Sequence, residues 1–169
     1  MRFLVATVLA ASLAACGNHK DAPAKSGSAA AATPVAVAPS TPADNAACKI
    51  VTAEDAAKVL GHPVKAPEPR VTGPLQSCRY GGEKAGTSVT VQYFEHGDRD
   101  FDSIQAAMIK EPVVITGAGT KAVRNADGSM LEVLNNGHLG VVMSMAIGKD
   151  AGPTAAAAEA FAPVLASRL

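Results

Sequence analysis

The sequence predicts an α+β fold: an antiparallel sheet of about five or six strands, two strands followed by a β-meander, with helices packed on one face. Between residues 77 and 147, short runs of alternating apolar and polar residues are separated by turn residues, the pattern of half-buried strands. Segments with helical periodicity precede, interrupt and follow these runs. Strands joined by hairpins, with helices between the groups, favour an antiparallel sheet covered by helices.

The folded region is expected to begin near Cys48, and its first helix is expected to follow Thr52. Thr52 is a suitable N-cap residue, and acidic residues in the first turn favour the helix dipole. The helix of residues 53–60 ends at Gly61, the residue type that most often follows a helix. The four prolines of residues 62–74 predict a surface loop.

Two strands and a second helix follow this loop. The strands are expected at residues 77–80 and 87–94, where β-branched and aromatic residues alternate with polar ones. A helix over residues 103–110, capped by Asp100 or Asp102, places its apolar residues on one face.

The rest of the chain predicts the meander and a last helix. The Asp-Gly pair at 127–128 and the Asn-Gly pair at 136–137 suit tight hairpins, since both tolerate positive φ. Pro153 can open the final helix, and Pro163 is expected to kink it. The expected strands of the meander are residues 113–115, 121–125, 130–134 and 139–147.

The chain begins with the layout of a secretory signal. Arg2 supplies a positive charge, and the apolar run of residues 3–13 is too short to cross a membrane. Leu13-Ala14-Ala15-Cys16 resembles the lipobox of bacterial lipoproteins, in which the cysteine is lipidated and becomes the first mature residue. The resemblance implies that residues 1–15 are a signal peptide and that Cys16 carries acyl chains. The alternative is an ordinary secreted protein in which a cysteine follows the cleavage site.

Residues 16–47 are predicted to form a disordered tether between the lipid and the domain. The stretch is rich in Ala and Pro and has few large apolar side chains to offset the entropy of ordering. The chain therefore divides into a signal peptide (1–15), a lipidated cysteine with its tether (16–47) and an α+β domain (48–169).

The remaining two cysteines predict a disulfide. If Cys16 is lipidated, Cys48 and Cys78 are left, and a compartment outside the cytoplasm favours their oxidation. The alternative is a reactive or metal-binding pair, but the two cysteines lack C-x-x-C spacing.

The charge balance gives no support for nucleic-acid binding. Fifteen Lys and Arg residues balance fifteen Asp and Glu residues, and no basic stripe or polybasic segment occurs. Attachment to a membrane would therefore depend on the acyl chains of Cys16.

Neither the acidic residues nor the histidines give good support for a metal site. Asp98, Asp100 and Asp102 have the spacing of a calcium loop. Ser103 and Ile109 stand where such a loop needs glycine and glutamate. The histidines lack the spacing of zinc ligands; they are His19, His62, His96 and His138.

Two further patterns favour ordinary structural roles. Residues 117–122 fit G-x-G-x-x-A after an apolar strand, but a dinucleotide site needs a helix next, and a strand is expected here. Met143 and Met145 would suit Cu(I). They are in phase with Val141 and Ile147, however, and are expected to line the core.

The sequence offers no nucleophile with a base, so we expect a protein that is not an enzyme and has no cofactor. The G-x-S-x-G motif of many hydrolases is absent. A hydrolase that acts on envelope polymers would need carboxylates that converge near residues 95–102.

Four short motifs lie along the domain. They are Cys48-Lys49-Ile50-Val51-Thr52 before a helix that ends Leu60-Gly61, then Ser77-Cys78-Arg79-Tyr80, the Gly-x-Gly turn of residues 117–123, and Leu165-Ala166-Ser167-Arg168-Leu169. Together they resemble a set of small bacterial lipoproteins of unknown function, in which Trp is common at the position of Tyr80. The resemblance implies a disulfide-linked α+β domain of the cell envelope and transfers no catalytic residue.

We therefore expect a lipid-anchored, non-catalytic binding or interaction module with an envelope protein as its partner. Gly17 stands where an Asp resembles an inner-membrane retention signal, which favours the outer membrane, facing the periplasm. The second hypothesis is a domain that binds a small ligand or a soft metal, and the third is an envelope-polymer hydrolase.

Overall fold

The structure is a computed structural model that describes residues 41–146 and 154–169. Cys16, His19, the signal peptide, most of the predicted tether, Ile147 and Pro153 lie outside the described residues. The described part has the predicted α+β composition, with four helices and seven strands. The helices are α1 (Ala46–Ile50), α2 (Ala53–Leu60), α3 (Gly97–Met108) and α4 (Ala155–Ala166). The strands are β1 (Glu68–Thr72), β2 (Leu75–Gly81), β3 (Ser88–Phe94), β4 (Val113–Val114), β5 (Lys121–Arg124), β6 (Met130–Asn135) and β7 (His138–Met145).

The strands form one antiparallel sheet in the order β1-β2-β3-β7-β6-β5-β4. The pairing of β3 with β7 joins the N-terminal hairpins to the meander at the centre of the sheet. Both predicted hairpin turns are confirmed, since Gly128, Asn136 and Gly137 have positive φ. Within the described ranges, no helix has both the length and the apolar character that a membrane span requires.

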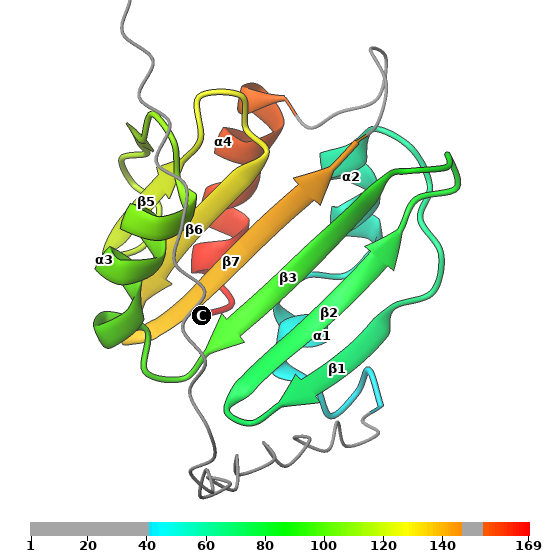
Figure 1. Ribbon diagram of the computed structural model, residues 1–169, viewed down its shortest axis with the longest axis horizontal. Coiled ribbons are helices and arrows are strands. Elements are labelled where there is room, and N and C mark those ends of the chain that lie inside the picture. Colours follow the sequence, from blue (N-terminus) through cyan, green and yellow to red (C-terminus); the bar gives the residue numbers. More distant parts are fainter. Residues whose placement is uncertain (1–40, 147–153) are drawn as a thin grey trace, which may run out of the picture. The chain divides into compact units, whose positions relative to one another are not determined.

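The expectation of helices on a single face is met only in part, because three of the four described helices share one face and α3 covers the other. Helices α1, α2 and α4 pack behind the sheet, whereas α3 crosses in front of β6 and β7 (Figure 1). The cause is visible in β6, in which every residue from Met130 to Leu134 is buried. A strand that is buried on both sides needs a cover on both sides.

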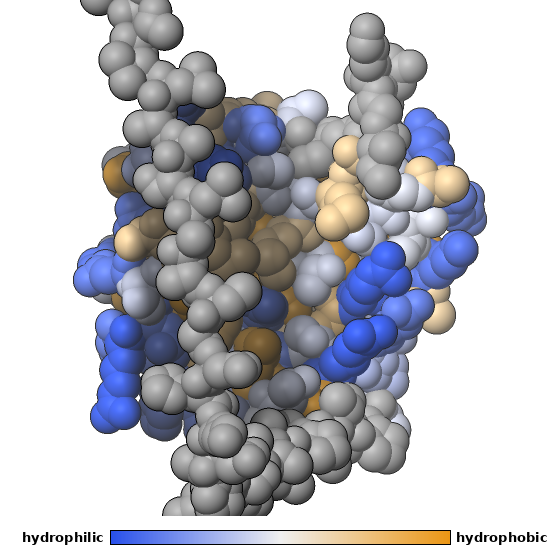
Figure 2. All heavy atoms as spheres, in the orientation of Figure 1, coloured by the Kyte–Doolittle hydropathy of each residue, from blue (hydrophilic) through white to orange (hydrophobic). Residues whose placement is uncertain are grey.

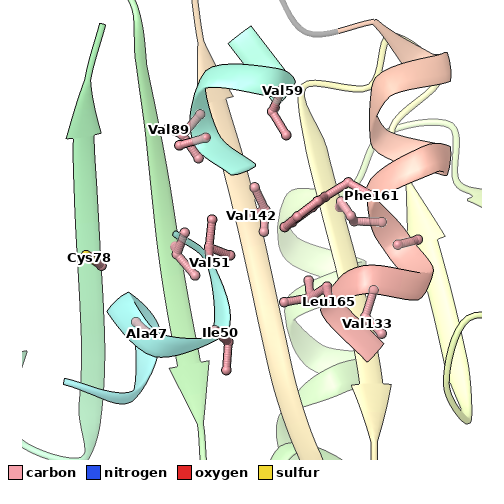
Figure 3. Close-up of a cluster of buried hydrophobic side chains, with 14 of the residues drawn as sticks. Ala47, Ile50, Val51, Val59, Cys78, Val89, Val133, Val142, Phe161 and Leu165 are labelled. Carbon is pink, nitrogen blue, oxygen red and sulfur yellow. The ribbon is translucent and has the colours of Figure 1, made fainter. Parts of the chain in front are cut away.

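The main core lies between the sheet and the three rear helices. Phe161 and Leu165 of α4 and Val59 of α2 meet strand residues such as Val89 and Val142 (Figure 3). A second, smaller cluster lies under α3 and contains Phe101, Ile109, Val123, Met130, Leu134, Leu139 and Val141. Each face of the central strands therefore has its own apolar layer.

Strand β1 raises the strand count above the predicted five or six. The sequence predicts a loop over residues 62–74 because of its prolines, yet residues 68–72 pair with β2. This strand lies at the edge of the sheet, where Pro69 is tolerated because one side of an edge strand needs no ladder bonds.

The folded region also begins before Cys48, because α1 starts at Ala46 within the predicted tether. Asn45 is fully buried, and its side-chain oxygen accepts a hydrogen bond from the Cys48 N–H. Its amide nitrogen donates to the carbonyls of Arg70 and Ser77, at 3.1 and 3.2 Å. These contacts fasten the start of the domain to the hairpin of β1 and β2.

Helix α3 begins six residues before the predicted start at Ser103, and neither Asp100 nor Asp102 caps it. The N-cap residue is His96, which makes no side-chain cap bond with the described residues. Instead, the N–H of Gly97 donates to the carbonyl of Gly137 at 2.7 Å. A Cβ at Gly97 would lie 2.5 Å from the Leu139 nitrogen, so the close approach to β7 requires glycine. A tertiary contact therefore sets this helix start.

A disulfide joins Cys48 of α1 to Cys78 of β2, with a Cα–Cα distance of 5.1 Å. This is consistent with the pairing that the sequence predicts. Cys78 is fully buried, and the bond lies beside the main core.

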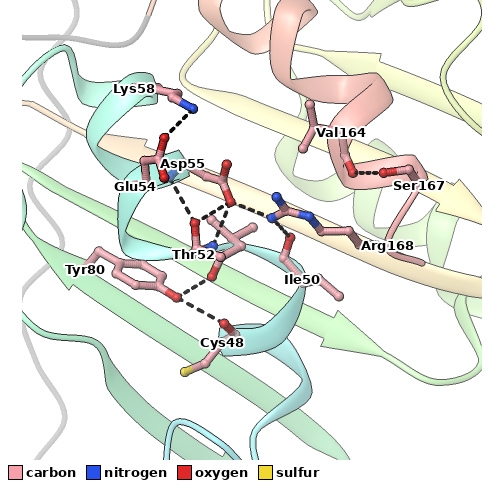
Figure 4. Close-up of polar contacts among 11 residues, drawn as sticks. Cys48, Ile50, Thr52, Glu54, Asp55, Lys58, Tyr80, Val164, Ser167 and Arg168 are labelled. Atoms are coloured by element: carbon pink, nitrogen blue, oxygen red, sulfur yellow. Dashed lines mark hydrogen bonds and ion pairs between the residues drawn. The ribbon is translucent and has the colours of Figure 1, made fainter.

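A polar cluster ties both ends of the domain together beside α2 (Figure 4). Thr52 and Asp55 form a capping box at the start of α2, and Arg168 Nη1 lies 2.5 Å from Asp55 Oδ2. The same guanidinium donates to the Ile50 carbonyl at 3.0 Å. Burial by itself raises the pKa of Asp55, but hydrogen bonds from Arg168 and Thr52 outweigh it and leave the pKa below its usual value.

Removing the disulfide should weaken the domain substantially. The double variant Cys48→Ala/Cys78→Ala is expected to lose about 3–4 kcal/mol in the free energy of unfolding, because the bond closes a long loop in the unfolded chain. Urea denaturation measures the loss. Reductant should destabilise the wild type by a similar amount and leave the double variant unchanged; a wild type that is insensitive to reductant would contradict the prediction.

Removing Arg168 should leave the buried Asp55 carboxylate without its cation. Arg168→Ala is expected to lower the free energy of unfolding at pH 7 by about 1–3 kcal/mol. Because the pKa of Asp55 is lowered in the folded state, this stabilisation is present above the unfolded pKa near 3.8 and is lost as the pH falls further. Urea denaturation from pH 7 to pH 3 measures it.

The matched control for this prediction is Arg79→Ala. Arg79 pairs with Glu68 at 3.5 Å, but both side chains are about half exposed, so the loss should stay below about 0.5 kcal/mol. Equal losses in the two variants would show that Arg168 does not stabilise the buried carboxylate.

Candidate functional site

A cleft of about 440 Å³ lies between α3 and the β4–β5 segment. We call it the α3 cleft. Phe101, Asp102 and Gln105 of α3 form one side of it, and residues of the segment 114–123 form the rest. Its volume falls in the range of small-ligand sites.

The cleft exists because α3 does not reach across the whole sheet. The helix packs mainly on β6 and β7, while β5 and the edge strand β4 lie beyond β6 in the sheet order. Val114, Val123, Glu132 and Val141 lie directly opposite one another on successive strands. Val123 and Val141 belong to the cluster under α3, so this row faces the helix, and Val114 at its end is 71 % exposed.

Among the described residues, no strand pairs with the outer side of β4, so this edge strand offers unpaired backbone groups beside the cleft. The Ile115 N–H donates to the Ala122 carbonyl at 2.9 Å. Hydrogen-bonded and non-hydrogen-bonded pairs alternate in an antiparallel ladder, so Val114 and Val123 form a non-hydrogen-bonded pair. The N–H and C=O of Val114 therefore point away from β5, toward the free edge.

A weak ion pair crosses the cleft. Lys121 Nζ lies 3.2 Å from Asp102 Oδ1 and 5.1 Å from the centre of the Phe101 ring. Both charged side chains are at least half exposed, so the pair contributes little to stability and exchanges partners at little cost.

The Gly-x-Gly motif is a turn, as the sequence predicts, and it forms one border of the cleft. Gly117 and Gly119 both have positive φ, and Gly119 packs so closely on β6 that a Cβ would lie 2.6 Å from the Leu134 carbonyl oxygen. Strand β5 follows it rather than the helix of a dinucleotide site.

Glu132 is the most unusual residue near the cleft. It is fully buried, and neither carboxylate oxygen has a hydrogen-bond partner among the described residues. Burial raises the pKa of Glu132 from 4.5 to about 7. That change corresponds to about 3 kcal/mol in favour of the protonated side chain.

The acidic run of residues 95–102 does not form a calcium loop, because Asp98, Asp100 and Asp102 lie within α3. Across residues 41–146 and 154–169, no group of three or more His, Cys, Asp or Glu side chains is placed to hold a metal ion. His138 instead stacks on Tyr93, with 2.9 Å between its Nδ1 and the Tyr93 hydroxyl.

The expectation that both methionines of β7 line the core holds for Met143 alone. Met143 packs against the cluster under α3, whereas Met145 is 61 % exposed. Helix α3 does not cover the sheet over β1 and β2, where hydrophilic side chains gather (Figure 2). Met145 lies on the α3 face of the sheet, since it alternates along β7 with Val141 and Met143 of the cluster under α3.

No family model, curated protein or solved structure matches this chain. The lipobox and the resemblance to small lipoproteins stay predictions. The candidate site therefore rests on the geometry of the α3 cleft.

Sequence reasoning missed the residues that make this site. Phe101, Val114 and Lys121 come from separate elements and meet only in the fold. Glu132 did leave a signal, because it interrupts the apolar run from Met130 to Leu134. A lone charge within a strand that is otherwise apolar marks a buried ionisable group.

Two glycine variants test the architecture of the turn. Gly117→Ala should cost about 1 kcal/mol in the free energy of unfolding, because φ is positive there but a Cβ has open space. Gly119→Ala has the same backbone cost plus a clash with the Leu134 carbonyl, and should cost at least about 1 kcal/mol more. Urea denaturation of both compares them; equal costs would show that the turn is not held against β6.

Proposed function

We propose that this chain is a lipid-anchored envelope protein whose domain is a non-catalytic interaction module, and that the α3 cleft is its binding site. The observation that carries the proposal is a cleft with an apolar floor that opens at an edge strand, whose outer backbone groups have no partner strand in the described part of the chain. The partner that fits this arrangement is an extended segment of an envelope protein.

The backbone of β4 supports an extended partner. Among the described residues, β4 has a neighbouring strand on one side only. A partner strand can pair with the outward N–H and C=O of Val114, the mode by which many modules bind extended peptides. Natural proteins usually protect such edges, and the two-residue length of β4 limits its aggregation risk.

The side chains of the cleft support a partner with an apolar anchor. The floor offers Val114 and Val123, the wall offers Phe101, and Lys121 and Asp102 stand beside them. An apolar side chain of the partner would fill the space. Polar groups next to it on the partner would replace Lys121 or Asp102 in their exposed ion pair. Such a buried anchor within a polar rim is how interfaces gain most of their affinity.

The anchor and tether give this module its place in the cell. Acyl chains on Cys16 would hold the module to a membrane. We favour the outer membrane, with the domain facing the periplasm. The Ala/Pro-rich tether would let the domain search for a partner at a distance from the bilayer.

A second candidate function is the binding of a small apolar ligand. The cleft volume of about 440 Å³ is large enough for one. Such a ligand would depend on Phe101 and Val123 but not on the backbone N–H of Val114, so the two candidates respond differently to changes at β4.

Val114→Pro separates the two candidates. Proline removes the outward N–H without removing a bond between β4 and β5, and an edge strand tolerates it. In the test, a photo-crosslinking residue replaces Thr116, which is exposed and lies beside the cleft. The full-length protein is crosslinked inside the cell that makes it. The yield of the protein adduct should fall about tenfold in Val114→Pro, because one backbone hydrogen bond to the partner is lost.

Val114→Thr is the matched control. It has a similar side-chain shape and keeps the N–H, so its adduct yield should stay near that of the wild type. A yield that Val114→Pro leaves unchanged would contradict strand addition. The lack of any protein adduct would favour the small-ligand candidate.

A further inference from the structure

Glu132 lies beneath the helix that walls the α3 cleft. On the sheet it lies between Val123 of β5 and Val141 of β7, both buried and apolar. From the helix side, Phe101 packs into the same cluster, which Ile109 completes just beyond the helix end. A carboxyl in this position is shielded from solvent and has no hydrogen-bond partner among the described residues.

Among the described residues, no positive charge compensates the carboxylate of Glu132. On β7 the residues of this face are Leu139, Val141, Met143 and Met145, none of which titrates. On β5, Lys121 shares the face but is paired with Asp102 of α3. The other cation of β5, Arg124, faces the opposite side and bonds Glu159 of α4. The remaining charged residues of α3 and the segment after it are Asp98, Arg99, Asp100, Lys110 and Glu111, all at least partly exposed.

Few buried contacts attach helix α3 to the sheet. Of its twelve residues, only Gly97 and Phe101 are buried. Two polar bonds fasten its ends: Gly97 N–H to the Gly137 carbonyl, and Lys110 N–H to Asn125 Oδ1 at 3.0 Å. Glu111, just after the helix, has a φ of 51°, a backbone conformation that is strained for residues other than glycine.

We propose that Glu132 is a pH-sensitive latch: when its carboxyl is protonated α3 closes on the sheet, and when it ionises α3 detaches more readily. A buried carboxylate without a partner is costly, and lifting α3 is the motion that brings water to it. The raised pKa of Glu132, about 7, places this change near neutral pH. The latch itself needs no ligand. Its effect on partner binding rests on the proposed function, because Phe101 would move out of the cleft when α3 detaches.

The sign of the pH dependence follows from the direction of the pKa shift. The closed state binds the proton more tightly than a state in which Glu132 is solvated, where the pKa is near 4.5. Closure therefore weakens as the pH rises from about 4.5 to about 7 and is then constant.

Hydrogen exchange tests the latch on the full-length protein without any partner. Exchange rates of the α3 amides are measured by mass spectrometry at pH 5.5 and pH 8 and divided by the intrinsic rates at each pH. The protection of α3 should fall roughly tenfold or more at pH 8 in the wild type. In Glu132→Gln it should not change with pH, and the amides of β2 and β3 should keep their protection in both proteins.

Glu132→Leu repeats the test if the buried amide of Glu132→Gln prevents folding. It also removes the ionisable group, so its α3 protection should again be independent of pH. An equal pH dependence of α3 in the wild type and the variants would overturn the latch, as would a wild-type loss that is as large in β2 and β3 as in α3. The crosslinking at Thr116 reports the proposed function separately.

Discussion

The two strands β6 and β7 must be covered on both faces, and most of the architecture follows from that requirement. Residues Met130–Leu134 and Leu139–Val142 are buried without a break. Alternate residues of such strands point to opposite faces, so one helix layer cannot cover them. Helix α4 supplies the rear layer and α3 the front layer. The front layer is narrower than the sheet, and the uncovered floor beside it is the α3 cleft.

The local elements were largely predictable because their signals are local. The Asn-Gly turn at 136–137, the alternation of β3 and the Thr52 cap each depend on a few neighbouring residues. The elements that the sequence did not reveal depend on distant contacts. Strand β1 exists because β2 pairs with it, and α3 starts at Gly97 because β7 approaches there.

The candidate site was less predictable than the fold, for a physical reason. Runs of polar residues are the usual local signal of a site, but the acidic run of residues 95–102 leads into the amphipathic helix α3. The cleft instead combines ordinary residues, such as Phe101 and Val114, whose importance comes from position alone. Only Glu132 broke a local rule, since a charge in an apolar strand conflicts with burial.

One helix connects the cleft and the buried carboxyl. Phe101 walls the cleft and belongs to the apolar cluster over Glu132, so the shape of the cleft and the solvation of Glu132 cannot change independently. A partner that packs on Phe101 favours the closed helix, and so does protonation of Glu132. Linkage therefore requires that partner binding favour the protonated carboxyl. A leucine at position 132 would fill the site without the cost of a buried acid. The presence of glutamate there makes the attachment of α3 adjustable, which a purely apolar layer would not be.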